Sequence, residues 1–201
     1  SHRGYRADPV PQEQLERLVD AARHASRSSF IQAYSVVVVR DAERTIEGWR
    51  WRYHSYPLNQ MSGLHSEIPA FLINFHSVDS VSDARAYIAR LQGVGPLLNE
   101  LARSAEVRAE KGIMPPKFVY GLVVDSCREI ITGAPFDTSG KKSALLEDIE
   151  GKVAALKDVD PTTRAQLLAD ATAALTGTVK PAYERLIALL QAQEKVATAD
   201  D

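Results

Sequence analysis

This sequence has a single cysteine, no long apolar run and no excess of basic residues. Each of these features excludes a class of protein. The one cysteine, Cys127, excludes a framework of internal disulfides and fits a reducing compartment. The apolar runs at 36–39 and 70–73 are far shorter than the ~20 residues that span a bilayer. Lysine and arginine number 24 against 26 acidic residues, so no basic footprint for nucleic acid is present. We predict neither a nucleic-acid nor a membrane partner. A cytoplasmic location is the default, with export left open because the sequence begins at Ser1 rather than Met.

The zinc-peptidase motif H-E-x-x-H is also absent. In that motif two imidazoles one helical turn apart bind zinc, and the glutamate acts as general base for the bound water. The nearest imitation is His65-Ser66-Glu67, with His54 and His76 near it in the sequence. On a helix the H-x-E spacing puts the two side chains about 200° apart, whereas on a strand they could share a face. We predict no metal site and no catalytic residue in the chain.

The sequence does contain apolar stripes with the period of a helix. One stripe, within 12–26, follows Pro11, which suits the first turn of a helix. Four valines at 36–39 predict a strand buried on both faces. The alternation of aromatic and basic residues over 49–54 predicts either a short strand or the end of a helix. Arginine stems lying over apolar surface are the favoured explanation for this alternation, ahead of stacking on single-stranded bases.

From Ser80 the pattern is helical almost to the end. Ser80 and Asp83 have the spacing of a capping box, and Asp160-Pro161 marks another helix start. We expect Gly95-Pro96 to interrupt or kink one helix, and Pro181 to split another near 178–180. The expected helices lie between Ser80 and Gly112, between Pro116 and Gly133, from about Ser143 to Lys157, and from Pro161 to about residue 192. The predicted fold is mostly α: a helical bundle-like body preceded by a short N-terminal helix–strand arm.

The arm, residues 1–41, resembles the N-terminal segment of the flavin-dependent NAD(P)H nitroreductases. The likeness rests on H-R-x-x-R at 2–6, P-V-P-x-E-x-L at 9–15, and A-A-R-H-A-S-x-S-S-F-x-Q at 21–32. The resemblance implies that His2, Arg3 and Arg6 bind the FMN phosphate, for which the planar fork of arginine is well suited. It also implies that Ser28 and Ser29 lie beside the flavin. The rest of the flavin shell is not recognisable after residue 41, so an FMN nitroreductase fragment is an alternative hypothesis.

The larger part, residues 45–196, resembles the bacterial domain of unknown function 885 family. The carrying motifs are Y-P-L-N-Q-M-S-G-L-H-S-E-I-P-A-F-L-I-N-F-H, D-A-R-A-Y-I-A-R-L-Q-G-V, E-K-G-I-M-P-P-K-F-V and V-K-P-A-Y-E-R-L-I-A-L-L. Family members look like long, mostly helical zinc metallopeptidases whose H-E-x-x-H lies beyond this segment. The resemblance implies zinc and a peptide substrate only in a longer form. Within such a form, Gln60, His65, Glu67 and His76 are candidates for facing the substrate cleft.

The two resemblances divide the chain into a nitroreductase-like arm at 1–43 and a helical domain at 44–201. The favoured interpretation is the helical domain of a metallopeptidase-like protein that is not catalytic alone. A helical protein-interaction module is a second alternative. Cys127 lies on the apolar stripe of its helix, which indicates a buried, inert thiol.

Overall fold

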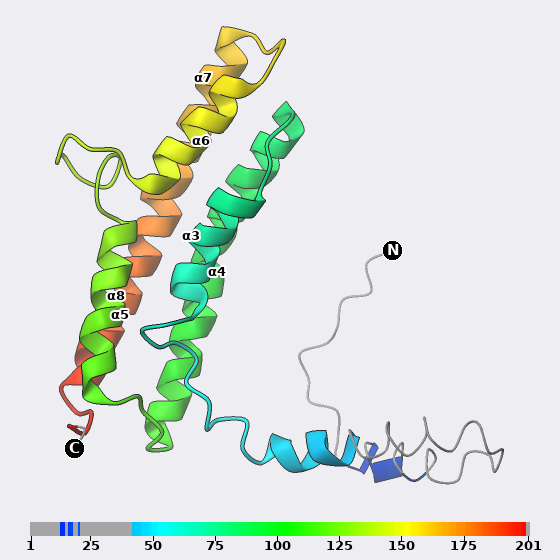
Figure 1. Ribbon diagram of the computed structural model, residues 1–201, viewed down its shortest axis with the longest axis vertical. Helices are drawn as coiled ribbons and strands as arrows, with labels where there is room; N and C mark the ends of the chain where they lie inside the picture. Colours follow the sequence, from blue (N-terminus) through cyan, green and yellow to red (C-terminus); the bar gives the residue numbers. More distant parts are fainter. Residues whose placement is uncertain (1–12, 15, 18–19, 21–41, 200–201) are drawn as a thin grey trace. The chain divides into compact units, whose positions relative to one another are not determined.

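The computed structural model describes Glu13, Gln14, Glu16, Arg17, Asp20 and residues 42–199. The chain divides into two compact units, Ser1–Ser55 and Tyr56–Asp201, and each is described by itself. In the first unit the described residues before residue 42 are helical, as the stripe within 12–26 predicts. Residues 42–49 form a further helix (Figure 1). The predicted valine strand at 36–39 lies outside the described residues.

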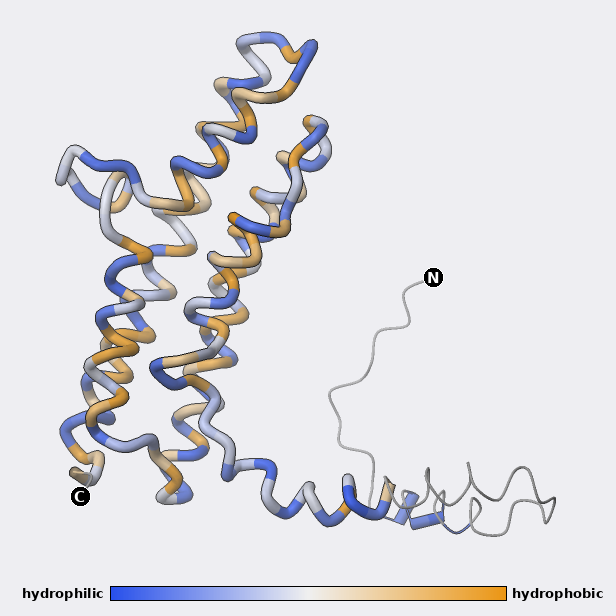
Figure 2. The backbone as a smooth tube through the Cα atoms, in the orientation of Figure 1, coloured by the Kyte–Doolittle hydropathy of each residue, from blue (hydrophilic) through white to orange (hydrophobic). Residues whose placement is uncertain are grey.

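The second unit is a bundle of helices (Figure 1). Its elements are α3 (Leu64–Phe75), α4 (Val81–Glu110), α5 (Lys117–Ile130), α6 (Ala144–Ala155), α7 (Pro161–Ala174), a π turn η1 (Leu175–Val179) and α8 (Lys180–Glu194). Over the described ranges no strand occurs, and β pairing is limited to two isolated bridges. Polar and apolar residues alternate along these helices, as expected of amphipathic elements (Figure 2). The predicted mostly α fold is therefore confirmed.

Local chemistry fixes where several of these helices begin and end. The Ser80 hydroxyl accepts from the Asp83 N–H at 3.2 Å and donates to the Asp83 carboxylate at 2.7 Å, which confirms the predicted cap of α4. Asp160 accepts from the Thr163 N–H at 2.9 Å, with Pro161 in the first turn of α7. Gly112 follows the end of α4 with a φ of 72°, a left-handed conformation that glycine adopts at low cost.

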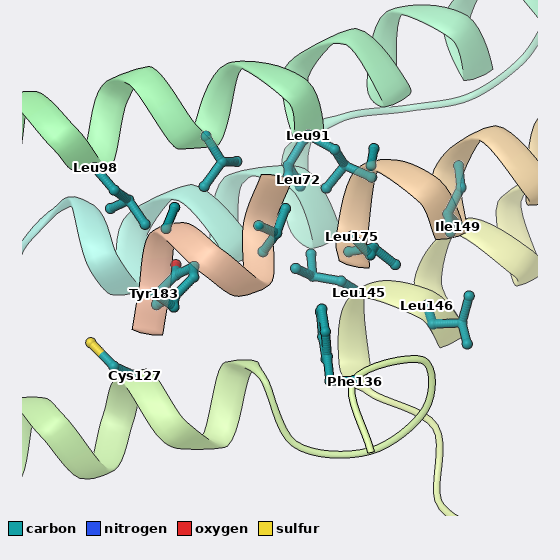
Figure 3. Packing of buried hydrophobic residues seen from close by; sticks show 14 of the residues in the cluster. Leu72, Leu91, Leu98, Cys127, Phe136, Leu145, Leu146, Ile149, Leu175 and Tyr183 are labelled. Carbon is teal, nitrogen blue, oxygen red and sulfur yellow. The ribbon is translucent and has the colours of Figure 1, made fainter. Parts of the chain in front are cut away.

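The core lies between α8 and the helices around it. α8 packs against both α4 and α5, while α7 packs against α4 and α6. Three tyrosines, Tyr87, Tyr120 and Tyr183, are among the largest fully buried side chains. Figure 3 shows leucines of α3, α4 and α6 meeting Tyr183 and the side chain of Phe136 in one continuous cluster. The helices thus share one apolar core, which holds α3 in place along α4.

The structure corrects the expectations at two prolines. Of the predicted interruption or kink at Gly95-Pro96, the interruption is wrong, because α4 runs unbroken from Val81 to Glu110 with Pro96 inside it. Packing of the turns on both sides offsets the single backbone hydrogen bond that a proline removes. Ahead of Pro181 the helix changes type instead of splitting, and the Lys180 N–H bonds to the Leu175 carbonyl in π geometry.

The segment at 49–54 is the end of a helix and not a strand. The helix at 42–49 continues into turns in which the Trp51 N–H donates to Gly48 O at 2.9 Å and the His54 N–H donates to Trp51 O at 2.8 Å. The apolar stretch at 70–75 likewise belongs to a helix, α3.

Candidate functional site

An open apolar groove of about 690 Å³ runs between α3 and α4. Its lining is spaced for one face of each helix, with positions 64, 68 and 71 on α3 and positions 89, 93 and 97 on α4. The full lining consists of Leu64, Glu67, Ile68, Phe71, Ala89, Arg90, Gly93, Val94 and Leu97. Phe71 and Leu97 remain 46% and 41% exposed, so the two helices do not close over the groove.

Gly93 lines the groove without a side chain. A Cβ placed at Gly93 would meet no atom within 4 Å, so the missing side chain leaves room above the backbone of α4. Gly95, two positions along, serves a different purpose, since a Cβ there would lie 2.9 Å from Cγ2 of Thr178. The first glycine therefore shapes the groove, and the second permits the close approach of α4 to η1.

Two charged side chains, those of Glu67 and Arg90, are among the residues that line the groove. Glu67 is in the first turn of α3, where a carboxylate is favoured by the helix dipole, and its Oε1 accepts from the Gly63 N–H at 3.1 Å. The Arg90 guanidinium lies over the ring of Phe71, with 5.5 Å between Cζ and the ring centroid. The groove thus combines a mostly apolar lining with one negative and one positive group.

His76 holds Arg90 in this position. Nη1 of Arg90 donates to Nδ1 of His76, and Nε2 of His76 lies 3.2 Å from the Asp83 carbonyl. A neutral imidazole with its proton on Nε2 satisfies both contacts. Burial of the ring, followed by the neighbouring Arg90 charge, lowers the pKa of His76 below its ordinary value.

A half-buried ion pair of α6 fixes the end of α3. Lys152 Nζ donates to the Leu72 carbonyl at 2.7 Å, to the Ile73 carbonyl at 3.0 Å and to the Asp148 carboxylate at 2.8 Å. The Tyr87 hydroxyl donates to the same carboxylate oxygen at 2.8 Å, and its burial raises the pKa of that phenol. A cation at the C-terminus of a helix satisfies carbonyls that have no partner within it. This network sets where α3 ends and hence where Phe71 and His76 lie.

His65 faces away from the groove, into the core. Its side chain is 2% exposed, its Nδ1 has no hydrogen-bond partner, and burial lowers its pKa. Its carbonyl accepts from the Tyr183 hydroxyl at 2.6 Å, and Gly63 leaves space for its ring. His65 and Glu67 therefore lie on opposite faces of α3, as the spacing predicts for a helix. His65 anchors α3 to α8.

The structure thus brings only some of the predicted cleft residues to the groove. Glu67 lines it, His76 positions Arg90 beside it, and His65 is buried behind it. Gln60 is exposed in the turn between Leu58 and Gly63 and does not line it. The predicted flavin-binding residues lie outside the described part of the chain; they are His2, Arg3, Arg6, Ser28 and Ser29.

Two residues of this site, Arg90 and Gly93, could not be recognised from the sequence. Arg90 has the appearance of an ordinary charge on a helix surface, because its partner His76 is separated from it by the loop before α4. Gly93 has no distinguishing feature in the sequence, because its role in the groove depends on the position of α3 beside α4. Across the described residues, no three His, Cys, Asp or Glu side chains are grouped closely enough to hold a metal ion. None of the described helices is long and apolar enough to cross a membrane.

Comparisons with other proteins place the chain in a family. The model of the "Bacterial protein of unknown function (DUF885)" family matches residues 6–201. The chain belongs to that family. The match continues through the predicted boundary at residue 44 and includes most of the segment with the nitroreductase resemblance. No curated protein matches the chain.

A solved structure shares the fold of this DUF885 chain. It is "the crystal structure of the putative lipoprotein from Colwellia psychrerythraea", with a TM-score of 0.74 and 14% sequence identity. The similarity covers 94% of this chain but 33% of the other, so the chain spans about a third of that protein's length. At this identity the likeness shows a common fold and no more.

Proposed function

We propose that this chain is a helical, non-catalytic domain of a larger zinc metallopeptidase-like protein, and that its α3–α4 groove binds an apolar stretch of a peptide substrate. The observation that carries the proposal is the open groove of about 690 Å³, whose lining is apolar except for Glu67 and Arg90. Binding sites for small molecules and peptides are typically concave, mostly apolar and furnished with a few polar groups.

The groove offers a distinct role to each kind of lining residue. The space above Gly93 accepts one apolar side chain, and Phe71 and Leu97 add apolar surface elsewhere in the lining. Arg90 suits a carboxylate or a peptide carbonyl, because its guanidinium presents several donors in a plane. Glu67 suits an amine or a backbone N–H, because a carboxylate accepts hydrogen bonds. The proposal assigns no catalytic group to this chain, and zinc chemistry would need the H-E-x-x-H motif of a longer form.

Fluorescence polarisation of the dansylated tripeptide Leu-Phe-Leu tests the groove. We expect saturable binding to the chain, and a loss of about tenfold in affinity for Phe71→Ala, since truncation of an aromatic side chain that acts as a binding hot spot costs more than about 1 kcal/mol. Phe118→Ala is the matched control, because Phe118 is similarly exposed on α5 and does not line the groove. Equal losses in the two variants, or no saturable binding, would contradict the proposal.

A separate experiment, peptide hydrolysis, tests the assignment as a non-catalytic domain. Hydrolysis of the same peptide is followed by chromatography, with and without added zinc, for this chain and for a longer relative that contains H-E-x-x-H. We expect cleavage only by the longer relative. Cleavage by the isolated chain would overturn the assignment.

The flavin alternative depends on residues outside the described part of the chain and stays a sequence prediction. A purified sample with the visible absorbance of about one bound flavin per chain would favour it.

A further inference from the structure

We infer that the aromatic–basic segment Trp49–His54 is a docking site for the surface of an anionic phospholipid membrane. This inference is independent of the proposed peptide groove, which lies in the other unit. It departs from the expectation of no membrane partner, which rested on the absence of an apolar run long enough to span a bilayer.

The two tryptophans of this segment are unusually accessible for their type. Trp49 is 56% exposed and Trp51 is 55% exposed, although tryptophan is highly buried on average. They are the only two tryptophans in the sequence, and they stand two positions apart. Indole rings concentrate at the level of lipid headgroups, where the apolar ring meets the acyl boundary and the N–H stays hydrated.

The arginines are arranged on these rings. The Cζ of Arg50 lies 5.1 Å from the ring centroid of Trp51, and the Cζ of Arg52 lies 5.1 Å from that of Trp49. Arg52 also donates through Nη1 to the Trp49 carbonyl at 2.9 Å, which fixes it against the turn. Each guanidinium therefore accompanies an indole, an arrangement that partly compensates a cation for leaving water.

Charge complementarity selects an anionic surface as the partner. The segment carries Arg50 and Arg52 with no acidic residue between 48 and 55, although the whole chain has a net charge of −2. A lipid surface can bind this segment without further basic residues. Its phosphate groups attract the two arginines, while the indole rings enter the interface. Nucleic acid fits less well for two reasons. Each indole already has an arginine over one of the faces on which a base would stack. Non-specific binding of nucleic acid also depends on more basic residues than this segment has.

Tryptophan emission tests this site directly, because both tryptophans of the protein lie in it. The full chain is titrated with vesicles of phosphatidylcholine alone, or of equal parts phosphatidylcholine and phosphatidylglycerol. We expect a blue shift and co-sedimentation with the anionic vesicles only, reversed by high salt because screening shortens the reach of surface charges. No shift and no sedimentation with anionic vesicles, or equal binding to neutral ones, would overturn the inference.

Two double variants separate the segment from general electrostatics. Arg50→Gln with Arg52→Gln is expected to weaken partitioning by at least about tenfold, since each basic residue near an anionic surface contributes about a factor of five. Arg103→Gln with Arg128→Gln removes the same charge from exposed sites on α4 and α5 and should leave partitioning unchanged. Circular dichroism checks that each variant keeps its helices. Equal losses in the two variants would overturn the inference, as would a shift induced by single-stranded DNA in place of vesicles.

Discussion

Arg90 connects the lining of the groove to a buried imidazole, because its Nη1 donates to Nδ1 of His76 while its guanidinium lies over Phe71. The contact requires His76 to be neutral, since a protonated imidazole has no acceptor and would face another cation. The position of a groove residue thus depends on the charge state of a residue that does not line the groove.

Acid is therefore expected to destabilise this unit through His76. Its pKa in the folded protein lies below the ordinary 6.5, so the unfolded chain binds the proton more readily. The stabilising contribution is complete above about pH 6.5 and is lost as the pH falls from there through the lowered folded pKa. Urea unfolding at several pH values measures this loss. His76→Gln should reduce the dependence of the unfolding free energy on pH, because glutamine can still accept from Arg90 but does not take up a proton. His54→Gln, at an exposed position, should not reduce it. Equal pH dependence in the two variants would count against this role of His76.

Lys152→Met should destabilise the fold by about 3 kcal/mol, because it leaves the Asp148 carboxylate and two carbonyls of α3 without their cation. The side chains of Lys152 and Asp148 are 19% and 13% exposed, so water replaces the contact only in part. Arg128→Met breaks a comparable but exposed pair with Asp125 and should change stability by less than about 0.5 kcal/mol. Thermal denaturation of both variants distinguishes them, and similar small effects would mean that the Lys152 network contributes little.

Gly93→Ala and Gly95→Ala should act in opposite directions. At Gly93 the added methyl meets no atom, so the better helix former is expected to stabilise α4 by about 0.5–1 kcal/mol. At Gly95 the methyl would lie 2.9 Å from Cγ2 of Thr178, and we expect a net loss of about 1–2 kcal/mol. Adding Thr178→Ser removes that methyl and should restore most of the loss. A failure of this rescue would show that the cost has another origin.

Cys127 should resist thiol reagents in the folded protein. The side chain is fully buried, and burial raises its pKa to about 12, so the reactive thiolate is scarce at neutral pH. Ellman's reagent is expected to label it only after unfolding in guanidinium chloride. Rapid labelling under native conditions would show that α5 opens readily around this position.

Much of the helical body could be predicted from the sequence, because its boundaries depend on local chemistry. Ser80, Asp160 and Gly112 act through contacts within a few residues, and those contacts appear as expected. The groove could not be predicted in the same way. It depends on α3 lying across Gly93, and on a bond between Arg90 and His76 that joins two elements through a loop. The prolines predicted helix boundaries only in part. Packing between α4 and η1 keeps α4 intact through Pro96.

The π turn allows one apolar face to continue along α7 and α8. Leu167 and Leu190 are both buried and stand 23 positions apart, which is about 6.4 turns of an α-helix and would point them in different directions. A π turn takes up one additional residue, which brings the separation to about 6.1 turns and both leucines to the same side. Gly177, exposed within that turn, is therefore a place where the chain can lose a residue while both halves of the helix keep their orientation. Most helices lack such a position, because removing one residue rotates everything beyond it by about 100°.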